Sequence, residues 1–110
     1  MQKTGAPLRV AIAGLGAVGL KLAEEIDKGI PGLKLVAVSA KNIDAAKERL
    51  HHLKAPPQVV DVAALEPLAD IVIECAPAAL VRQIVEPFVR NGKTAIVLSC
   101  GALLNNMDLV

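Results

Sequence analysis

The sequence predicts an α/β fold in which helices cover both faces of an open parallel sheet, the doubly wound arrangement. Short aliphatic runs alternate with amphipathic helical patterns along the whole chain. Of the 110 residues, 54% are hydrophobic and only Phe88 is aromatic, so the core must be built from Val, Leu, Ile and Ala. Such a core suits strands covered by helices on both faces and suits a β-sandwich poorly. One modest domain is expected at this length.

The first part of the chain predicts two strands joined by a helix. The strand at residues 8–13 is short and aliphatic, and residues 20–28 place apolar side chains four positions apart among charged ones, which is a helix pattern. Gly29 is expected just past the end of this helix. Residues 33–38 then form the second strand.

The middle of the chain predicts a second helix and a third strand. The helix begins at Asn42 or Asp44 and runs to about Leu53, before Pro56-Pro57 prevents further helix. Residues 58–60 form a short third strand.

The last part of the chain completes the alternation. Asp61 is expected to cap a brief helix over residues 62–65. A fourth strand at residues 69–74 is followed by a helix from Pro77, a residue suited to a first helical turn, to roughly Arg90. Residues 94–99 form the fifth strand.

Right-handed crossovers between these strands predict a Rossmann sheet of order 3-2-1-4-5. The ligand crevice of such a sheet lies at the carboxyl ends of strands 1 and 4, where the order reverses. Three loops should therefore converge there, at residues 14–19, 75–77 and 99–101.

The first of these loops carries a G-x-G-x-x-G motif between strand and helix, at Gly14-Leu15-Gly16-Ala17-Val18-Gly19. Gly14 allows a sharp turn, Gly16 has no Cβ to block a pyrophosphate, and Gly19 allows the helix to pack closely on the sheet. The helix N-terminus then offers N–H groups and partial positive charge to phosphates. The motif predicts dinucleotide binding; the alternative is a glycine-rich turn without a ligand.

The end of the second strand bears on the choice of cofactor. A domain that prefers NAD usually has an acidic residue here, whereas this chain has Ser39-Ala40-Lys41-Asn42. A carboxylate would repel a 2′-phosphate, and Ser39, Lys41 and Asn42 can instead donate to one. We therefore expect NADP, or use of both NAD and NADP. The alternative is that Lys41 is an ordinary solvated lysine.

Five other residues attract attention without indicating a metal or catalytic site. His51 and His52 are expected to be a surface pair near the negative end of a helix. Glu74 is either a base or, as we prefer, a partner of backbone donors at the next helix N-terminus. Cys75 and Cys100 end neighbouring strands, so an adventitious disulfide is conceivable, but a reduced pair lining the crevice is favoured.

Charge and composition disfavour several function classes. The net charge is +1 and no basic cluster occurs, which argues against nucleic acid as a partner. Apolar runs are too short for a membrane span, and the first seven residues lack the apolar core of a signal peptide. A cytoplasmic location is the default expectation.

Taken together, the glycine motif, residues 72–77 (VIECAP) and residues 97–103 (VLSCGAL) resemble the N-terminal domain of L-aspartate dehydrogenases. These belong with the homoserine-dehydrogenase-like NAD(P)-binding domains, and the resemblance spans residues 8–110. It implies an enzyme that oxidises the amine of L-aspartate to an imine by hydride transfer to NAD(P), with a second domain carrying the small-molecule substrate. Alternatives are a dehydrogenase of homoserine or another small substrate, and a non-catalytic NAD(P)(H)-sensing module.

The resemblance also implies a set of cofactor contacts. The phosphate loop corresponds to Gly14, Leu15, Gly16, Ala17, Val18 and Gly19, and the adenosine ribose contacts to Ser39, Ala40, Lys41 and Asn42. The nicotinamide-ribose side corresponds to Cys75, Ala76, Pro77, Ser99, Cys100 and Gly101. The family's catalytic histidine belongs to the substrate domain, and neither His51 nor His52 matches it, so no catalytic residue is assigned.

We expect residues 1–110 to be a dinucleotide-binding domain that is truncated at its C-terminal end. Asn106 or Asp108 is typical of a helix cap, and a complete fold would add a sixth strand and a substrate domain. Strand 5 would then be an exposed aliphatic edge, which predicts self-association or poor solubility. We also expect a homo-oligomer.

Overall fold

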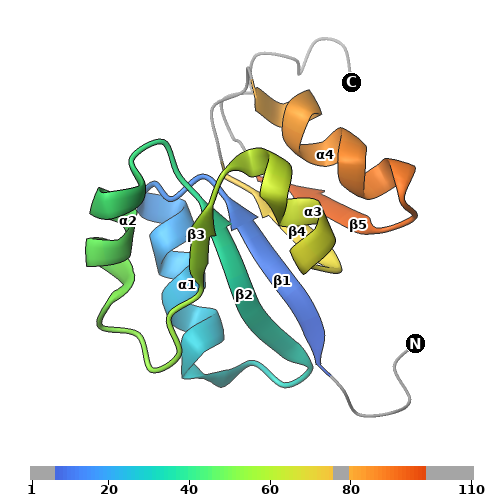
Figure 1. Ribbon diagram of the computed structural model, residues 1–110. Helices are drawn as coiled ribbons and strands as arrows, with labels where there is room; N and C mark the ends of the chain where they lie inside the picture. The colour runs from blue at the N-terminus through green and yellow to red at the C-terminus, as the bar shows by residue number, and fades with distance from the viewer. Residues whose placement is uncertain (1–6, 76–79, 99–110) are drawn as a thin grey trace, which may run out of the picture.

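The computed structural model describes residues 7–75 and 80–98, which form one five-stranded sheet flanked by helices (Figure 1). The strands pair in the order β3-β2-β1-β4-β5, and every pair is parallel. Both features confirm the predicted topology. The strands are β1 Leu8–Ala13, β2 Leu33–Ser39, β3 Gln58–Val60, β4 Ile71–Glu74 and β5 Thr94–Val97.

Helices lie on both faces of this sheet, as a doubly wound fold requires. They are α1 Ala17–Gly29, α2 Ile43–Leu50, the short 3₁₀ helix η1 Val62–Ala64, α3 Leu65–Leu68 and α4 Val81–Arg90. Side chains of α1 and α2 share one buried cluster with β1 and β2, whereas those of α3 and α4 share a second cluster with β1, β2 and β4. No helix within the described ranges is long and apolar enough to cross a membrane.

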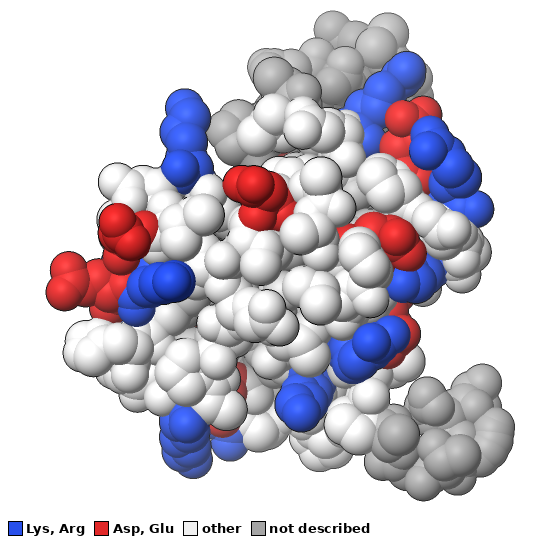
Figure 2. Space-filling view, in the orientation of Figure 1, with Lys and Arg blue, Asp and Glu red and all other residues white. Residues whose placement is uncertain are grey.

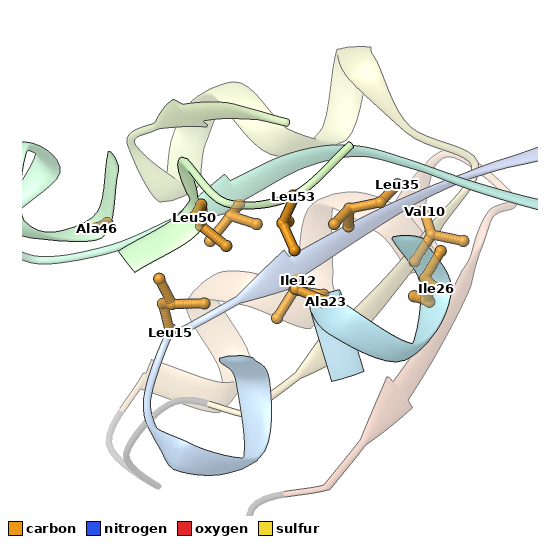
Figure 3. Close-up of a cluster of buried hydrophobic side chains, with 10 residues drawn as sticks. Val10, Ile12, Leu15, Ala23, Ile26, Leu35, Ala46, Leu50 and Leu53 are labelled. Atoms are coloured by element: carbon orange, nitrogen blue, oxygen red, sulfur yellow. The ribbon is translucent and has the colours of Figure 1, made fainter. Parts of the chain in front are cut away.

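Aliphatic side chains fill both clusters, as the composition predicts. The first cluster is shown in Figure 3 and consists of Val10, Ile12, Leu15, Ala23, Ile26, Leu35, Val38, Ala46, Leu50 and Leu53. The second contains the single aromatic residue, Phe88, which is only 1% exposed, together with small and branched residues such as Ala11, Ala13 and Ile84. Small residues of β1 face α3 and α4, so these helices can approach the sheet closely.

Several element ends differ from the predicted ones. Helix α1 begins at Ala17, three residues before the predicted start, because Gly16 serves as its N-cap. Helix α2 ends at Leu50 rather than Leu53, and β2 extends to Ser39. Strand β4 begins at Ile71 instead of Ala69, because Ala69 is the C-cap of α3, and β5 ends at Val97. The predicted α4 start at Pro77 and the last residue of strand 5, Ser99, lie outside the described residues.

Asp61 occupies the predicted N-cap position, but its side chain does not make the predicted capping bond. An N-cap carboxylate would accept from the N–H two or three residues ahead. The Ala64 N–H instead donates to the main-chain carbonyl of Asp61 at 2.9 Å, which closes a 3₁₀ turn, and the Asp61 side chain makes no capping bond.

A register shift occurs in β2 that the hydrophobic pattern does not reveal. Val10 pairs with Leu35 and Ala11 with Ala37, so Val36 is an additional residue opposite β1. Val36 and Ala37 both pack toward the α3 and α4 cluster, and Val38 returns to the α1 and α2 cluster. After the bulge, the alternation of β2 side chains between the two faces of the sheet is therefore shifted by one residue.

An ion pair between Arg9 and Asp70 connects β1 and β4 at the end of the sheet where these strands begin. The Arg9 guanidinium donates from Nη2 to Asp70 Oδ1 at 2.9 Å and from Nε to Oδ2 at 3.2 Å, and the Arg9 main-chain N–H also donates to Oδ2 at 2.9 Å. Backbone bonds link Asp70 to Arg9 and to Thr94, so this residue connects β1, β4 and β5. These hydrogen bonds from Arg9 lower the pKa of Asp70 from 3.8 to about 2.

We predict that Asp70→Asn lowers the free energy of unfolding at neutral pH by about 1 kcal/mol, a modest figure because both side chains are partly solvated. Because the pKa of Asp70 is lower in the folded chain, its contribution is present above the unfolded value near 3.8 and is lost as the pH falls toward 2. Urea unfolding between pH 7 and pH 2 tests this. An unchanged pH dependence in the variant would contradict it.

Candidate functional site

The candidate site lies at the carboxyl edge of the sheet, where four strands end in line. Ala13 at the end of β1 pairs with Ser39 of β2 and with Glu74 of β4, and Glu74 pairs with Val97 of β5. After β1 the chain continues to α1 on one face of the sheet. After β4 it continues to α4 on the other face. This is the reversal of strand order at which ligands bind in open α/β sheets.

The glycine loop connects β1 to α1 and is tied to β2. Gly14 has φ +96°, a conformation that favours glycine, and its N–H donates to the Ser39 carbonyl at 3.1 Å. A Cβ on Gly19 would overlap the Gly14 carbonyl oxygen and lie 3.4 Å from the Ile12 methyl Cγ2. The loop and the first turn of α1 therefore pack together only because Gly19 has no side chain.

Gly16 differs from the other two glycines because its missing Cβ serves no internal contact. Its φ is −95°, which any residue can adopt, and a Cβ there would meet nothing within 4 Å. The first helical bond of α1 is Leu20 N–H to Gly16 carbonyl, so the N–H groups of residues 17–19 precede it, and the first turn carries no acidic side chain. Open space beside such donors fits an anionic group such as a diphosphate.

The end of β2 presents an accessible cation beside this loop. Ser39 is buried, at 2% exposure, whereas Lys41 and Asn42 are exposed and Ala40 is half-buried. Asn42 Oδ1 accepts from the Ala45 N–H at 2.9 Å, which confirms Asn42 as the start of the second helix. Of the three predicted donors, Lys41 is thus the one that combines a positive charge with exposure to solvent.

The end of β4 joins the same edge through Cys75. The Cys75 N–H donates to the Ala13 carbonyl at 2.8 Å, beside the start of the glycine loop. Burial, together with the neighbouring Glu74, raises the pKa of the half-buried Cys75 thiol to about 11, so the sulfur stays protonated and neutral. Glu74 is fully buried at the strand end. A protonated thiol is a poor nucleophile, so no nucleophilic role is assigned to Cys75.

Several predicted site residues lie outside the described part of the chain. They are Ala76, Pro77, Ser99, Cys100 and Gly101. The expected proximity of Cys75 to Cys100, and the pairing of Glu74 with donors at the following helix N-terminus, fall there too. The described residues bring together the glycine loop, the end of β2 and Cys75.

The two histidines lie on the surface after α2, as predicted. His52 Nε2 contacts Glu24 Oε2 at 3.0 Å, and His51 Nδ1 contacts the Glu48 carbonyl oxygen at 2.7 Å. No group of three or more possible metal ligands occurs within the described ranges. In the view of Figure 2, acidic and basic side chains are interspersed over the visible face.

Arg49 contacts the glycine loop, and this contact was not predicted from the sequence. This residue lies on α2, and its Nη1 donates to the Leu15 carbonyl at 2.8 Å. Leu15 itself is buried, at 8% exposure, in the cluster that includes Ala46 and Leu50. Ala46, Arg49 and Leu50 share a face of α2 because they follow helical spacing, but this spacing does not identify the glycine loop as the partner of Arg49.

The chain is similar in sequence to L-aspartate dehydrogenases of two bacteria. It is 49% identical over 109 residues to L-aspartate dehydrogenase of Bradyrhizobium diazoefficiens, covering 99% of this chain and 39% of that protein. It is 45% identical over 103 residues to L-aspartate dehydrogenase 3 of Bordetella bronchiseptica, covering 93% of this chain and 38% of that protein. The chain thus spans about two fifths of the length of these relatives.

Structural similarity supports the same fold. The apo scyllo-inositol dehydrogenase of Lactobacillus casei superposes with a TM-score of 0.72 at 20% identity, over 96% of this chain and 33% of that one. At this identity the likeness concerns the fold alone. Residues 14–110, which begin at the first glycine of the loop, match a sequence family described as the NAD-binding domain of homoserine dehydrogenase. The chain belongs to this family.

Proposed function

We propose that this chain binds NAD or NADP in the crevice at the carboxyl edge and forms the cofactor-binding part of an L-aspartate dehydrogenase. The observation that carries the proposal is the open space at Gly16 beside the first turn of α1, in a loop that is tied to the end of β2. The similarity to L-aspartate dehydrogenases over nearly the whole chain supports the choice of enzyme.

In this proposal each segment of the edge contacts a different part of the cofactor. Residues 14–19 hold the diphosphate with backbone donors, and residues 39–42 contact the adenosine ribose. Cys75, with Ala76, Pro77, Ser99, Cys100 and Gly101, lines the nicotinamide side. When bound, NAD(P) accepts the hydride from the substrate carbon that bears the amine. The substrate and the acid–base group are held by a separate domain of the enzyme.

The charges at the end of β2 favour a cofactor with a 2′-phosphate. Residues 39–42 contain no carboxylate that would accept from ribose hydroxyls and repel a phosphate. The exposed ammonium group of Lys41 can instead pair with it. We therefore propose NADP as the preferred cofactor, with NAD also bound.

A homo-oligomer in the cytoplasm is part of the same proposal. Strand β5 lies at one edge of the described sheet, and Ile96 and Leu98 are 43% and 37% exposed. Within residues 7–75 and 80–98 no strand pairs with the outer side of β5, and this edge with its exposed aliphatic side chains favours association with another copy.

We predict that Gly16→Val abolishes measurable NAD(P)H binding while the chain stays folded. The new side chain would fill the space beside the α1 donors, but its Cβ meets no atom of the chain itself. Binding is measured by titration while the fluorescence of the nicotinamide ring itself is followed, because the chain has no Trp that could act as an energy donor. Gly19→Ala is the contrasting variant: its methyl group would overlap the Gly14 carbonyl, so it should also lower the thermal midpoint. Retained affinity in Gly16→Val would move the phosphate site off this loop.

We predict that the wild-type chain binds NADPH more tightly than NADH and that Lys41→Ala removes most of the difference. Loss of one exposed charge-assisted hydrogen bond should weaken NADPH binding roughly five- to tenfold and leave NADH binding unchanged. Lys47→Ala, which removes an equal charge from α2, is the control. Equal or tighter binding of NADH by the wild type would refute the 2′-phosphate argument, and binding of neither would refute the crevice itself.

We predict that the chain self-associates as its concentration rises and that Ile96→Lys shifts it toward the monomer. The substitution places a charge on β5 at a side chain that is 43% exposed and belongs to neither buried cluster. Light scattering coupled to size exclusion, over a concentration series, gives the mass. A wild-type chain that remains monomeric throughout would contradict the expectation.

A further inference from the structure

Two independent contacts attach the glycine loop to α2, and both involve Leu15. Arg49 Nη1 donates to the Leu15 carbonyl at 2.8 Å. The Leu15 side chain lies in the buried cluster with Ala46 and Leu50, which Figure 3 shows. The neighbouring residue Gly14 is held in turn by the Ser39 carbonyl of β2. The first two residues of the loop are therefore attached to β2 and α2 respectively.

The Arg49 contact determines the direction of a backbone donor. The Leu15 carbonyl and the Gly16 N–H belong to one planar trans peptide, in which the two groups point in opposite directions. A carbonyl held on the Arg49 guanidinium thus turns the Gly16 N–H away from that guanidinium. Without this contact, the same peptide could rotate its electronegative oxygen toward a bound anion.

We propose that Arg49 is a positioning residue of the phosphate loop. It holds the peptide between Leu15 and Gly16 in one orientation and so presets the loop for the diphosphate of a dinucleotide. A loop that is ordered before binding loses less conformational entropy when the ligand arrives, and its affinity rises accordingly. This inference rests on the proposed cofactor binding, but its structural part can be measured without a cofactor.

The test compares Arg49→Ala, Arg49→Lys and the control Lys47→Ala, which changes the charge of α2 equally. In the ligand-free chain, amide hydrogen exchange over residues 13–20 should become faster in Arg49→Ala and stay unchanged in Lys47→Ala. Affinities for NADH and NADPH should fall by the same factor, roughly tenfold, in Arg49→Ala. Arg49→Lys, which can still donate to the carbonyl, should restore part of both.

Other results would overturn the proposal. Unchanged exchange over residues 13–20 in Arg49→Ala would remove the positioning role, whatever happens to the thermal midpoint. A loss for NADPH alone would make Arg49 a direct contact of the 2′-phosphate, and an equal loss in Lys47→Ala would indicate only a general effect of charge. If the wild type bound neither nucleotide, the proposed function would fail, while the exchange measurement would still decide whether Arg49 orders the loop.

Discussion

The close approach of α1 to β1 at Gly19 is the constraint on which the site depends. The position that a side chain would occupy there is taken by the Gly14 carbonyl oxygen. Because the helix can come this near, its first turn begins shortly after the strand, and its first N–H groups lie at the edge of the sheet. A helix held further out would need a longer loop, and its N-terminus would no longer lie beside the ends of β2 and β4.

The sheet supplies the second requirement, which is that loops from distant parts of the sequence meet. Parallel pairing aligns Ala13, Ser39 and Glu74 across three strands, so the loops after these residues all leave the sheet from one edge. Hydrogen bonds from Gly14 to Ser39 and from Cys75 to Ala13 then hold the emerging segments to one another. The meeting of these loops at one edge is thus a consequence of strand order.

Topology and most elements could be predicted from sequence because they depend on patterns that repeat. Aliphatic runs, helical spacing and the glycine motif identify the order of strands without any knowledge of contacts. The β2 bulge at Val36, the 3₁₀ turn at Asp61 and the contact of Arg49 with Leu15 were missed for a common reason. Each depends on how two backbone segments come to lie in three dimensions, and a glycine loop of unknown orientation gives no reason to pair its carbonyl with an arginine 34 residues away.

In the proposed complex with a dinucleotide, backbone and side chains divide the recognition between them. The donors of the glycine loop are main-chain N–H groups whose direction is set by Gly14, Gly19 and the Leu15 peptide, so they favour any diphosphate equally. In that proposed complex, Lys41, which is exposed, would discriminate between NAD and NADP. A substitution at Lys41 can therefore change the cofactor preference at little cost in stability. A side chain at Gly19 would instead overlap the Gly14 carbonyl oxygen and disturb the packing of α1 on the sheet.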